Sequence, residues 1–315
     1  MIHSNFARHH SPKGTRPAYF HAHRSGALQQ KIERAREIFK SCTLCPRSCE
    51  VNRYEETGIC NLGEFSRVSS YFPHHGEEPC IRGSNGSGTI FFTSCNLRCS
   101  FCQNYDISHT LAGEVVPPHR LAGMMMELQD LGCHNINLVT PSHVVFQILE
   151  ALPFAVEMGL RLPLVYNSSA YDSEESLDLL NGIIDIYMPD FKFWKASTSK
   201  SYMQAHDYPN RAQNALKKMH LQVGDLELDG SGIAVRGLLV RHLVMPDSLE
   251  ETEAILGFLA SELSARTSVN VMFQYHPDGK VPGRERFIPI NRRPTPGECR
   301  QALSIARDLG LQVIS

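Results

Sequence analysis

Three cysteines in one short loop are the residues of this chain best suited to redox chemistry. Cys95, Cys99 and Cys102 have the spacing C-x3-C-x2-C and directly follow Ile90–Phe92, an apolar run typical of a buried strand. Thiolates hold iron–sulfur clusters, and a four-iron cluster ordinarily uses four of them. A loop with three leaves one iron with an open position, where a ligand can bind and react. The alternative is three core or zinc-binding cysteines with accidental spacing.

This loop resembles the signature of the radical S-adenosylmethionine (SAM) enzymes. The resemblance rests on the cysteine spacing, on the preceding strand and on Phe101, the aromatic residue just before the last cysteine. In that family the open iron chelates SAM, and one electron from the cluster breaks a carbon–sulfur bond to give a 5'-deoxyadenosyl radical. The resemblance therefore implies a [4Fe-4S] cluster and SAM as cofactors, and an oxidoreductase.

A second group of cysteines, Cys42, Cys45, Cys49 and Cys60, precedes this loop. We call residues 42–60 the cysteine knuckle. A site closed by four thiolates has no open position, so its metal should be structural or electron-transferring. The spacing leaves open a second iron–sulfur cluster, which we slightly favour, a zinc ion, or no metal.

The elements that must position these cysteines alternate along the chain. Strands are expected at 90–92, 136–139, 164–166, 183–188, 237–244 and 269–273, and helices at 121–131, 144–158, 173–180, 212–219, 249–263 and 296–309. Alternation of this kind implies parallel strands joined by right-handed crossovers. The predicted fold is α/β: a partial (β/α)6 TIM-like barrel over 85–315, preceded by a flexible leader at 1–26 and a helix with the cysteine knuckle at 27–84.

Barrel enzymes carry their chemistry on the loops at the carboxyl ends of the strands. Polar residues stand at these places: Asn104, Asn167, Asp190, Lys192 and His276. Arg241 lies within the fifth strand and is the candidate catalytic residue. Its alternative role is a structural ion pair, because a charge buried in a barrel wall needs a partner.

Within the radical SAM family, residues 85–290 resemble the activating enzymes of glycyl-radical enzymes, such as pyruvate formate-lyase activating enzyme. The matching segments are Cys102–Asp106, Asp190-Phe-Lys192, Arg241–Pro246 and Tyr275-His276. The resemblance implies that Phe101 contacts adenine and that the site residues Asn104, Asp190, Lys192 and His276 bind the cofactor.

One motif of the activating enzymes is missing. They carry Gly-Gly-Glu-Pro after the second strand, which holds the SAM amino group, whereas this chain has Leu138-Val-Thr140-Pro141-Ser142. We expect Thr140 and nearby backbone carbonyls to take that role. The cysteine knuckle also precedes the barrel, unlike the extra clusters of activating enzymes, so the chain resembles an uncharacterised branch of their homologues.

Charge and composition restrict the partners. Lys and Arg number 31 and Asp and Glu 33 in 315 residues, a net charge of -2, so no global field favours nucleic acid or an anionic membrane. No apolar run approaches the roughly 20 residues that span a bilayer. Ten cysteines in metal-type spacings indicate a reducing compartment. We expect a soluble, cytoplasmic protein.

Two functions follow as hypotheses. The first is a radical SAM enzyme that abstracts hydrogen from a protein, peptide or other substrate, with activation of a glycyl-radical protein as one form, and that takes electrons from flavodoxin or ferredoxin. The second is an iron–sulfur or zinc protein for interaction or electron transfer, without SAM chemistry.

Overall fold

A largely parallel sheet forms the centre of the molecule, which is described here by a computed structural model covering residues 16–314. Its strands lie in the order β10-β9-β8-β6-β5-β4-β2-β1-β3. The parallel series consists of β2 (Ser87–Phe92), β4 (Ile136–Val139), β5 (Leu164–Asn167), β6 (Ile186–Tyr187), β8 (Ala234–Leu243) and β9 (Ser268–Met272). The α/β class and the parallel order of the predicted strands are therefore confirmed.

Four further strands complete the sheet. β1 (Ser66–His74) pairs antiparallel with β2, and β3 (Glu114–Val116) pairs antiparallel with β1. At the other edge β10 (Gln312–Val313) pairs parallel with β9, and β7 (Glu227–Leu228) pairs with β8. In the described part of the chain β3 and β10 end the strand order, so the sheet stays open rather than closing into a full barrel.

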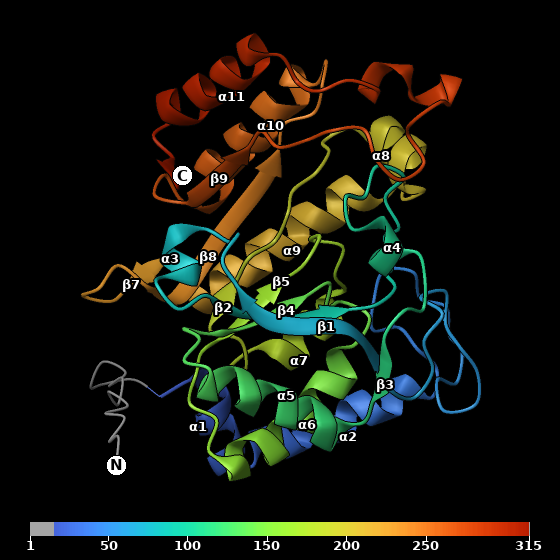
Figure 1. Ribbon diagram of the computed structural model, residues 1–315, viewed down its shortest axis with the longest axis vertical. Helices are drawn as coiled ribbons and strands as arrows, with labels where there is room; N and C mark the ends of the chain where they lie inside the picture. Colours follow the sequence, from blue (N-terminus) through green and yellow to red (C-terminus); the bar gives the residue numbers. More distant parts are fainter. Residues whose placement is uncertain (1–15, 315) are drawn as a thin grey trace, which may run out of the picture.

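Helices connect the parallel strands and cover the outside of the sheet (Figure 1). They are α1 (Ala18–Arg24), α2 (Ala27–Phe39), α3 (Pro79–Arg82), α4 (Tyr105–Ser108), α5 (Pro118–Asp130), α6 (Val145–Met158), α7 (Glu174–Leu180), α8 (Ala196–Met203), α9 (Tyr208–Val223), α10 (Leu249–Phe258) and α11 (Pro296–Asp308). Ser173 caps α7 by accepting a hydrogen bond from the Ser176 N–H at 3.2 Å, which satisfies one free donor of the first turn.

The prediction of a loose leader over 1–26 is wrong for its last third. Residues 18–24 form α1, and Tyr19 is fully buried. The Tyr19 hydroxyl donates to the Leu162 carbonyl at 3.0 Å, and the Ala18 N–H donates to Asp185 at 2.8 Å. These contacts fasten the segment to the amino end of the sheet; residues 1–15 lie outside the described residues.

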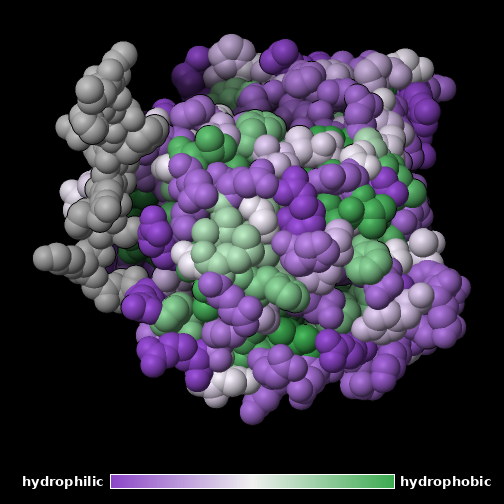
Figure 2. Space-filling model, turned by 60° about the horizontal axis from the view of Figure 1, so that its bottom comes forward, coloured by the Kyte–Doolittle hydropathy of each residue, from purple (hydrophilic) through white to green (hydrophobic). Residues whose placement is uncertain are grey.

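The helical face at the bottom of Figure 1 mixes hydrophilic and hydrophobic residues. Figure 2 shows green groups on it that are interrupted by purple ones. Leu131, Phe154 and Met158 are its exposed large apolar side chains, near the ends of α5 and α6. No helix among residues 16–314 is long and apolar enough to cross a membrane.

Candidate metal and cofactor site

A cavity of about 1210 Å³ lies at the carboxyl ends of the parallel strands. Its wall contains nine of the residues that the sequence selects for chemistry: Cys95, Cys99, Phe101, Cys102, Asn104, Thr140, Asp190, Lys192 and Arg241. These residues lie on or directly after four strands, β2, β4, β6 and β8, and are spread over nearly 150 positions of the chain. Three thiols facing one cavity are a suitable donor set for a cluster with one open iron.

The loop after β2 turns sharply to present its cysteines. Ser94 and Arg98 have φ of 65° and 52°, in the left-handed region that L-residues rarely adopt. The Leu97 N–H donates to Cys95 Sγ at 3.3 Å, and the Ser108 hydroxyl donates to Cys102 Sγ at 3.2 Å. Hydrogen bonds of this kind orient sulfur ligands and tune a bound cluster.

Burial raises the pKa of the Cys95 and Cys99 thiols. Buried thiols stay protonated unless a cation compensates the thiolate, and a metal does so outright. Metal binding at this loop should therefore release protons.

Lys192 and Asp190 form an ion pair in the cavity wall. Lys192 Nζ lies 2.5 Å from Asp190 Oδ2. Burial disfavours the lysine charge, but Asp190 and the Cys99 thiol outweigh it, so the pKa of Lys192 is raised. Asp190 Oδ1 is buried and has no hydrogen-bond partner in the described chain. A buried acceptor left over in a cavity wall fits a donor group of a ligand.

The aromatic residue of the motif also faces this space. Phe101 packs edge-on against Phe193 and Tyr275, with ring centroids 5.5 and 6.3 Å apart. His276 is not part of the cavity wall. Its side chain is 42% exposed and lies 3.0 Å from Gln103 and 3.5 Å from Asp278. Since β9 ends at Met272, the chain has left the strand before it reaches His276.

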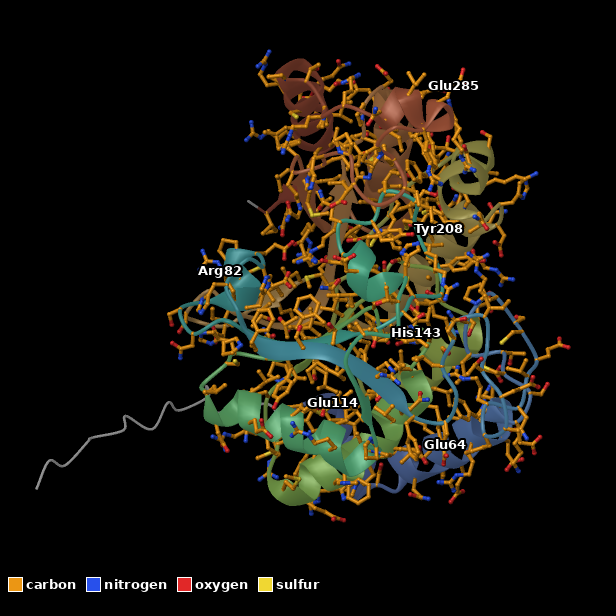
Figure 3. All side chains as sticks on the ribbon, turned by 45° about the vertical axis from the view of Figure 1, so that its right-hand side comes forward. Glu64, Arg82, Glu114, His143, Tyr208 and Glu285 are labelled. Carbon is orange, nitrogen blue, oxygen red and sulfur yellow. The ribbon has the colours of Figure 1, made fainter. Side chains whose placement is uncertain are left out.

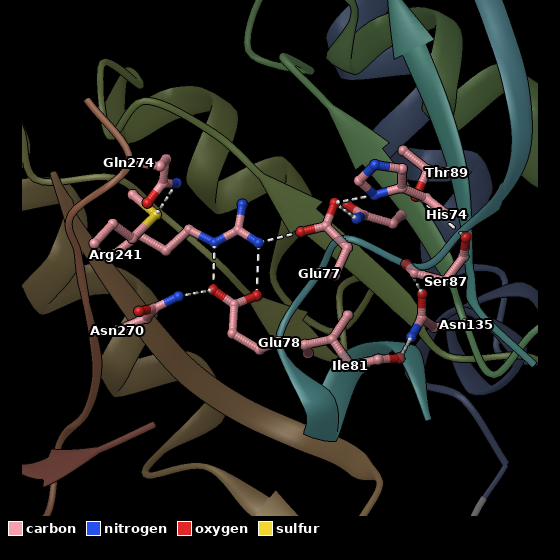
Figure 4. A network of polar contacts seen from close by, with 12 residues as sticks. His74, Glu77, Glu78, Ile81, Ser87, Thr89, Asn135, Arg241, Asn270 and Gln274 are labelled. Atoms are coloured by element: carbon pink, nitrogen blue, oxygen red, sulfur yellow. Dashed lines mark hydrogen bonds and ion pairs between the residues drawn. The ribbon is translucent and has the colours of Figure 1, made fainter. Parts of the chain in front are cut away.

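Arg241 lies in the cavity wall, but two carboxylates hold it there (Figure 4). Its Nε and Nη2 donate to Glu78 at 2.7 and 2.6 Å, and Nη2 also donates to Glu77. Asn270 donates to the same Glu78 carboxylate at 2.7 Å. The structural ion pair that was the alternative role for Arg241 is thus present. Burial opposes the charge of Arg241, but the carboxylates of Glu78 and Glu77 outweigh burial, so the pKa of Arg241 is raised.

Sequence reasoning missed Glu77 and Glu78 as cavity residues. They stand in the run His74-His75-Gly-Glu77-Glu78-Pro79, ahead of the first barrel strand. Two features of the sequence could have identified them. An arginine within a strand needs acidic partners, and two adjacent acidic residues stand next to a proline.

Thr140 lies where the missing glycine motif would be. Its φ is 60°, and its N–H donates to the Asn167 carbonyl at 2.9 Å. Both residues line the cavity. A β-branched residue in the left-handed region is strained, so the backbone here keeps a conformation that glycine would adopt freely.

The thiols of the cysteine knuckle lie close to one another. Cys42, Cys45 and Cys60 are buried and Cys49 is partly exposed. Burial first, and then the neighbouring Cys60 and Cys42, raises the pKa of Cys45 to about 12. A Cβ on Gly58 would lie 3.1 Å from Cys49 Sγ and 3.5 Å from Cys60 Sγ. Among residues 16–314 no group of three or more His, Cys, Asp or Glu side chains is arranged to hold a single metal ion.

Comparison with known proteins places the chain in a family. No protein-family model matches it. The uncharacterized protein MJ0674 of Methanocaldococcus jannaschii is 35% identical over 296 residues, which cover 91% of this chain and 80% of the relative. The chain belongs to the MJ0674 family.

Two solved structures align with part of this chain. SuiB of Streptococcus suis bound to S-adenosylmethionine aligns with 70% of this chain at a TM-score of 0.49 and 14% identity. The cobalamin-dependent S-adenosylmethionine radical enzyme OxsB aligns with 61% at a TM-score of 0.40 and 11% identity. The chain matches about half of the SuiB length (48%) and 29% of the OxsB length.

Proposed function

We propose that this protein is a radical SAM enzyme that reductively cleaves SAM at a three-cysteine [4Fe-4S] cluster and abstracts hydrogen from a substrate. One observation carries the proposal: Cys95, Cys99 and Cys102 face the same cavity as Phe101 and the Lys192–Asp190 pair. When bound, the cluster and SAM supply the one-electron and radical chemistry. The protein supplies the thiolates, the orientation of SAM and a space shielded from solvent.

The residues around the thiols have defined tasks in this proposal. The Phe101 ring, fixed by Phe193 and Tyr275, offers a flat apolar surface for adenine. Asp190 Oδ1, which has no partner among residues 16–314, accepts a hydrogen bond from a hydroxyl or ammonium group of SAM. Lys192 keeps a positive charge beside Cys99, so it offsets part of the negative charge of the thiolates.

The cavity has room for more than SAM. Pockets for one small molecule commonly measure about 300–1,000 Å³, and this one measures about 1210 Å³. The cluster and SAM would fill much of this volume, so a substrate would place only its reacting part beside SAM. The resemblance to activating enzymes supports a protein or peptide substrate, with a glycyl-radical protein as the first to try, and flavodoxin or ferredoxin as electron donor.

The test is anaerobic reconstitution with iron and sulfide, reduction with dithionite, addition of SAM and measurement of 5'-deoxyadenosine. The expected result is product together with a change in the electron paramagnetic resonance (EPR) spectrum of the reduced cluster when SAM binds. A loaded, reduced cluster that gives neither would contradict the proposal and favour a metal-binding or electron-transfer protein without SAM chemistry.

A further inference from the structure

The cysteine knuckle and the three-cysteine loop touch at Asn96, among other contacts. We infer that the knuckle holds a second iron–sulfur cluster and passes single electrons through Asn96 to the cluster at Cys95, Cys99 and Cys102. This inference rests on the proposed function, because it assigns the source of the electron that SAM cleavage consumes.

Asn96 is in contact with a cysteine of each group. Its side chain lies close enough to the Cys45 thiol of the knuckle to favour the thiolate. Its Oδ1 lies 3.9 Å from Cys95 Sγ. Asn96 is 2% exposed, and its Nδ2 donates to the Tyr171 carbonyl at 2.9 Å, which fixes the amide. Electron transfer slows steeply with distance, so a fixed and dry contact between two sulfur sites favours transfer.

Arg47 fastens the knuckle to the same loop. It stands between Cys45 and Cys49 in sequence, and its Nε donates to the Asn96 carbonyl at 2.8 Å. Its Nη1 donates to the Gln204 carbonyl at 2.9 Å, and its guanidinium lies 5.2 Å from the centre of the Tyr171 ring. Because Arg47 binds both the Asn96 and the Gln204 carbonyls, the knuckle keeps a constant separation from the three-cysteine loop.

Further bonds make this interface continuous. The Ser94 hydroxyl donates to the Cys60 carbonyl at 2.5 Å. The buried Arg53 lies 3.8 Å from Cys42 Sγ and donates to the Gly63 carbonyl at 3.0 Å. Figure 3 views the side on which the knuckle loops, coloured blue, lie against the rest of the molecule. Arg47 and Arg53 bring positive charge to a site of four thiolates, which a buried cluster needs.

The knuckle also provides a place where electrons can enter. In the knuckle Cys49 is partly exposed, and in the cavity loop Cys102 is partly exposed while Cys95 and Cys99 are buried. An external one-electron donor of the flavodoxin or ferredoxin type can therefore approach the knuckle at Cys49 without entering the SAM cavity. In each turnover the donor loses one electron, the knuckle cluster is reduced and reoxidised, and the cluster at Cys95, Cys99 and Cys102 gains that electron. No atom is transferred in this step.

Metal analysis of the wild-type protein tests the first half of the inference. Two four-iron clusters require about eight irons, and changing Cys42, Cys45, Cys49 and Cys60 together to Ala should lower this to about four. The wild-type count needs no variant to fold. About four irons with one zinc, or four irons and no other metal, would overturn the inference.

Kinetics test the second half. Asn96→Leu removes the polar contacts of Asn96 with Cys45 and Cys95. Flavodoxin should therefore reduce the cluster at Cys95, Cys99 and Cys102 more slowly, while the iron content stays at about eight. Freeze-quench EPR measures the rate of this reduction. Dithionite is small enough to enter the cavity, so the ratio of the flavodoxin-driven to the dithionite-driven reduction rate should fall. Gln129→Leu, a buried amide on α5 remote from both cysteine groups, is the matched control. An unchanged ratio in Asn96→Leu would overturn the relay.

These readouts separate the relay from the proposed function. If both clusters load and exchange electrons but SAM is not cleaved even with dithionite, the proposed function fails and the relay stands. If dithionite supports cleavage and the knuckle holds zinc, the relay fails and the proposed function stands.

Discussion

Arg241 and Glu78 form an ion pair with two hydrogen bonds across the inside of the sheet, at 2.7 and 2.6 Å. Glu78 is buried, with a side-chain exposure of 2%, and Arg241 is mostly covered, with 12%. Glu77 would still pair with Arg241 in Glu78→Gln, so the double change Glu77→Gln with Glu78→Gln, which leaves the guanidinium without a carboxylate, should lower the free energy of unfolding by about 3–5 kcal/mol. Denaturant titration of the metal-free protein measures this. Glu37→Gln, which breaks an exposed pair with Lys40, should cost less than about 1 kcal/mol, and equal losses would contradict the argument.

The three cavity cysteines should behave differently from the other buried thiols. Cys95→Ala, Cys99→Ala or Cys102→Ala should each abolish 5'-deoxyadenosine formation and lower the iron content, because two thiolates cannot hold the cluster securely. Cys133 is buried away from the cavity wall. Cys133→Ala should cost only packing, about 1 kcal/mol, and leave turnover intact. Turnover in a cavity-cysteine variant would remove that residue from the ligand set.

Lys192 and His276 should affect SAM affinity more than cluster loading. Lys192→Ala leaves the Asp190 carboxylate without its counter-ion in the cavity wall, so SAM binding per cluster should weaken strongly. His276→Ala should have the smaller effect, since this side chain is 42% exposed and outside the wall. Titration with SAM, followed by EPR and normalised to iron, measures both. A loss of iron at unchanged SAM affinity would show that these placements are wrong.

Gly58 gives the knuckle room for its sulfurs. Gly58→Ala places a methyl group 3.1 Å from Cys49 Sγ and 3.5 Å from Cys60 Sγ, so metal bound at the knuckle should decrease while iron at the cavity loop remains. Gly63→Ala is the matched control within the same segment, because its Cβ would meet only ordinary contacts, the nearest at 3.4 Å. Metal analysis of both variants tests this prediction. Equal metal contents in Gly58→Ala and Gly63→Ala would contradict a metal role for the sulfurs of Cys49 and Cys60.

His242 should make the protein less stable in acid. Burial lowers its pKa from 6.5 to about 4, so between these values the unfolded chain binds a proton that the folded protein does not. Stability is therefore lost as the pH falls from 6.5 to 4, by about 3 kcal/mol for this residue. His242→Phe should show a shallower decline of unfolding free energy over that window. The His242→Phe protein should also be less stable than the wild type at pH 7, because the Phe191 carbonyl and the Thr252 hydroxyl lose their hydrogen-bond partner.

The parallel strands were predictable because their signals are local. Residues 136–139 were predicted as a strand and form β4 with the same bounds, and Ser173 caps α7 as expected. Apolar runs and capping residues report on their own segment, so no distant contact is needed. The cavity cysteines follow for the same reason, since the loop that carries them is continuous in sequence.

What the sequence did not reveal depends on distant contacts. α1 has only seven residues, too few to be stable alone, and is fixed by Leu162 and Asp185, which are 143 and 167 residues away. The placement of Glu77 and Glu78 depends on Arg241 in the same way. Thr140 was identified from a motif comparison, and its positive φ emerged only with the fold.

The ion pair inside the sheet also sets an order of events during synthesis. Glu78 leaves the ribosome 163 residues before Arg241, its partner. Contacts this distant in sequence form slowly, and until β8 emerges the two carboxylates of Glu77 and Glu78 have no guanidinium to receive them. The amino-terminal half can pair its early strands, but the interior of the nascent protein stays open and hydrated. The wall of the cavity therefore cannot be completed before residue 241 has been synthesised.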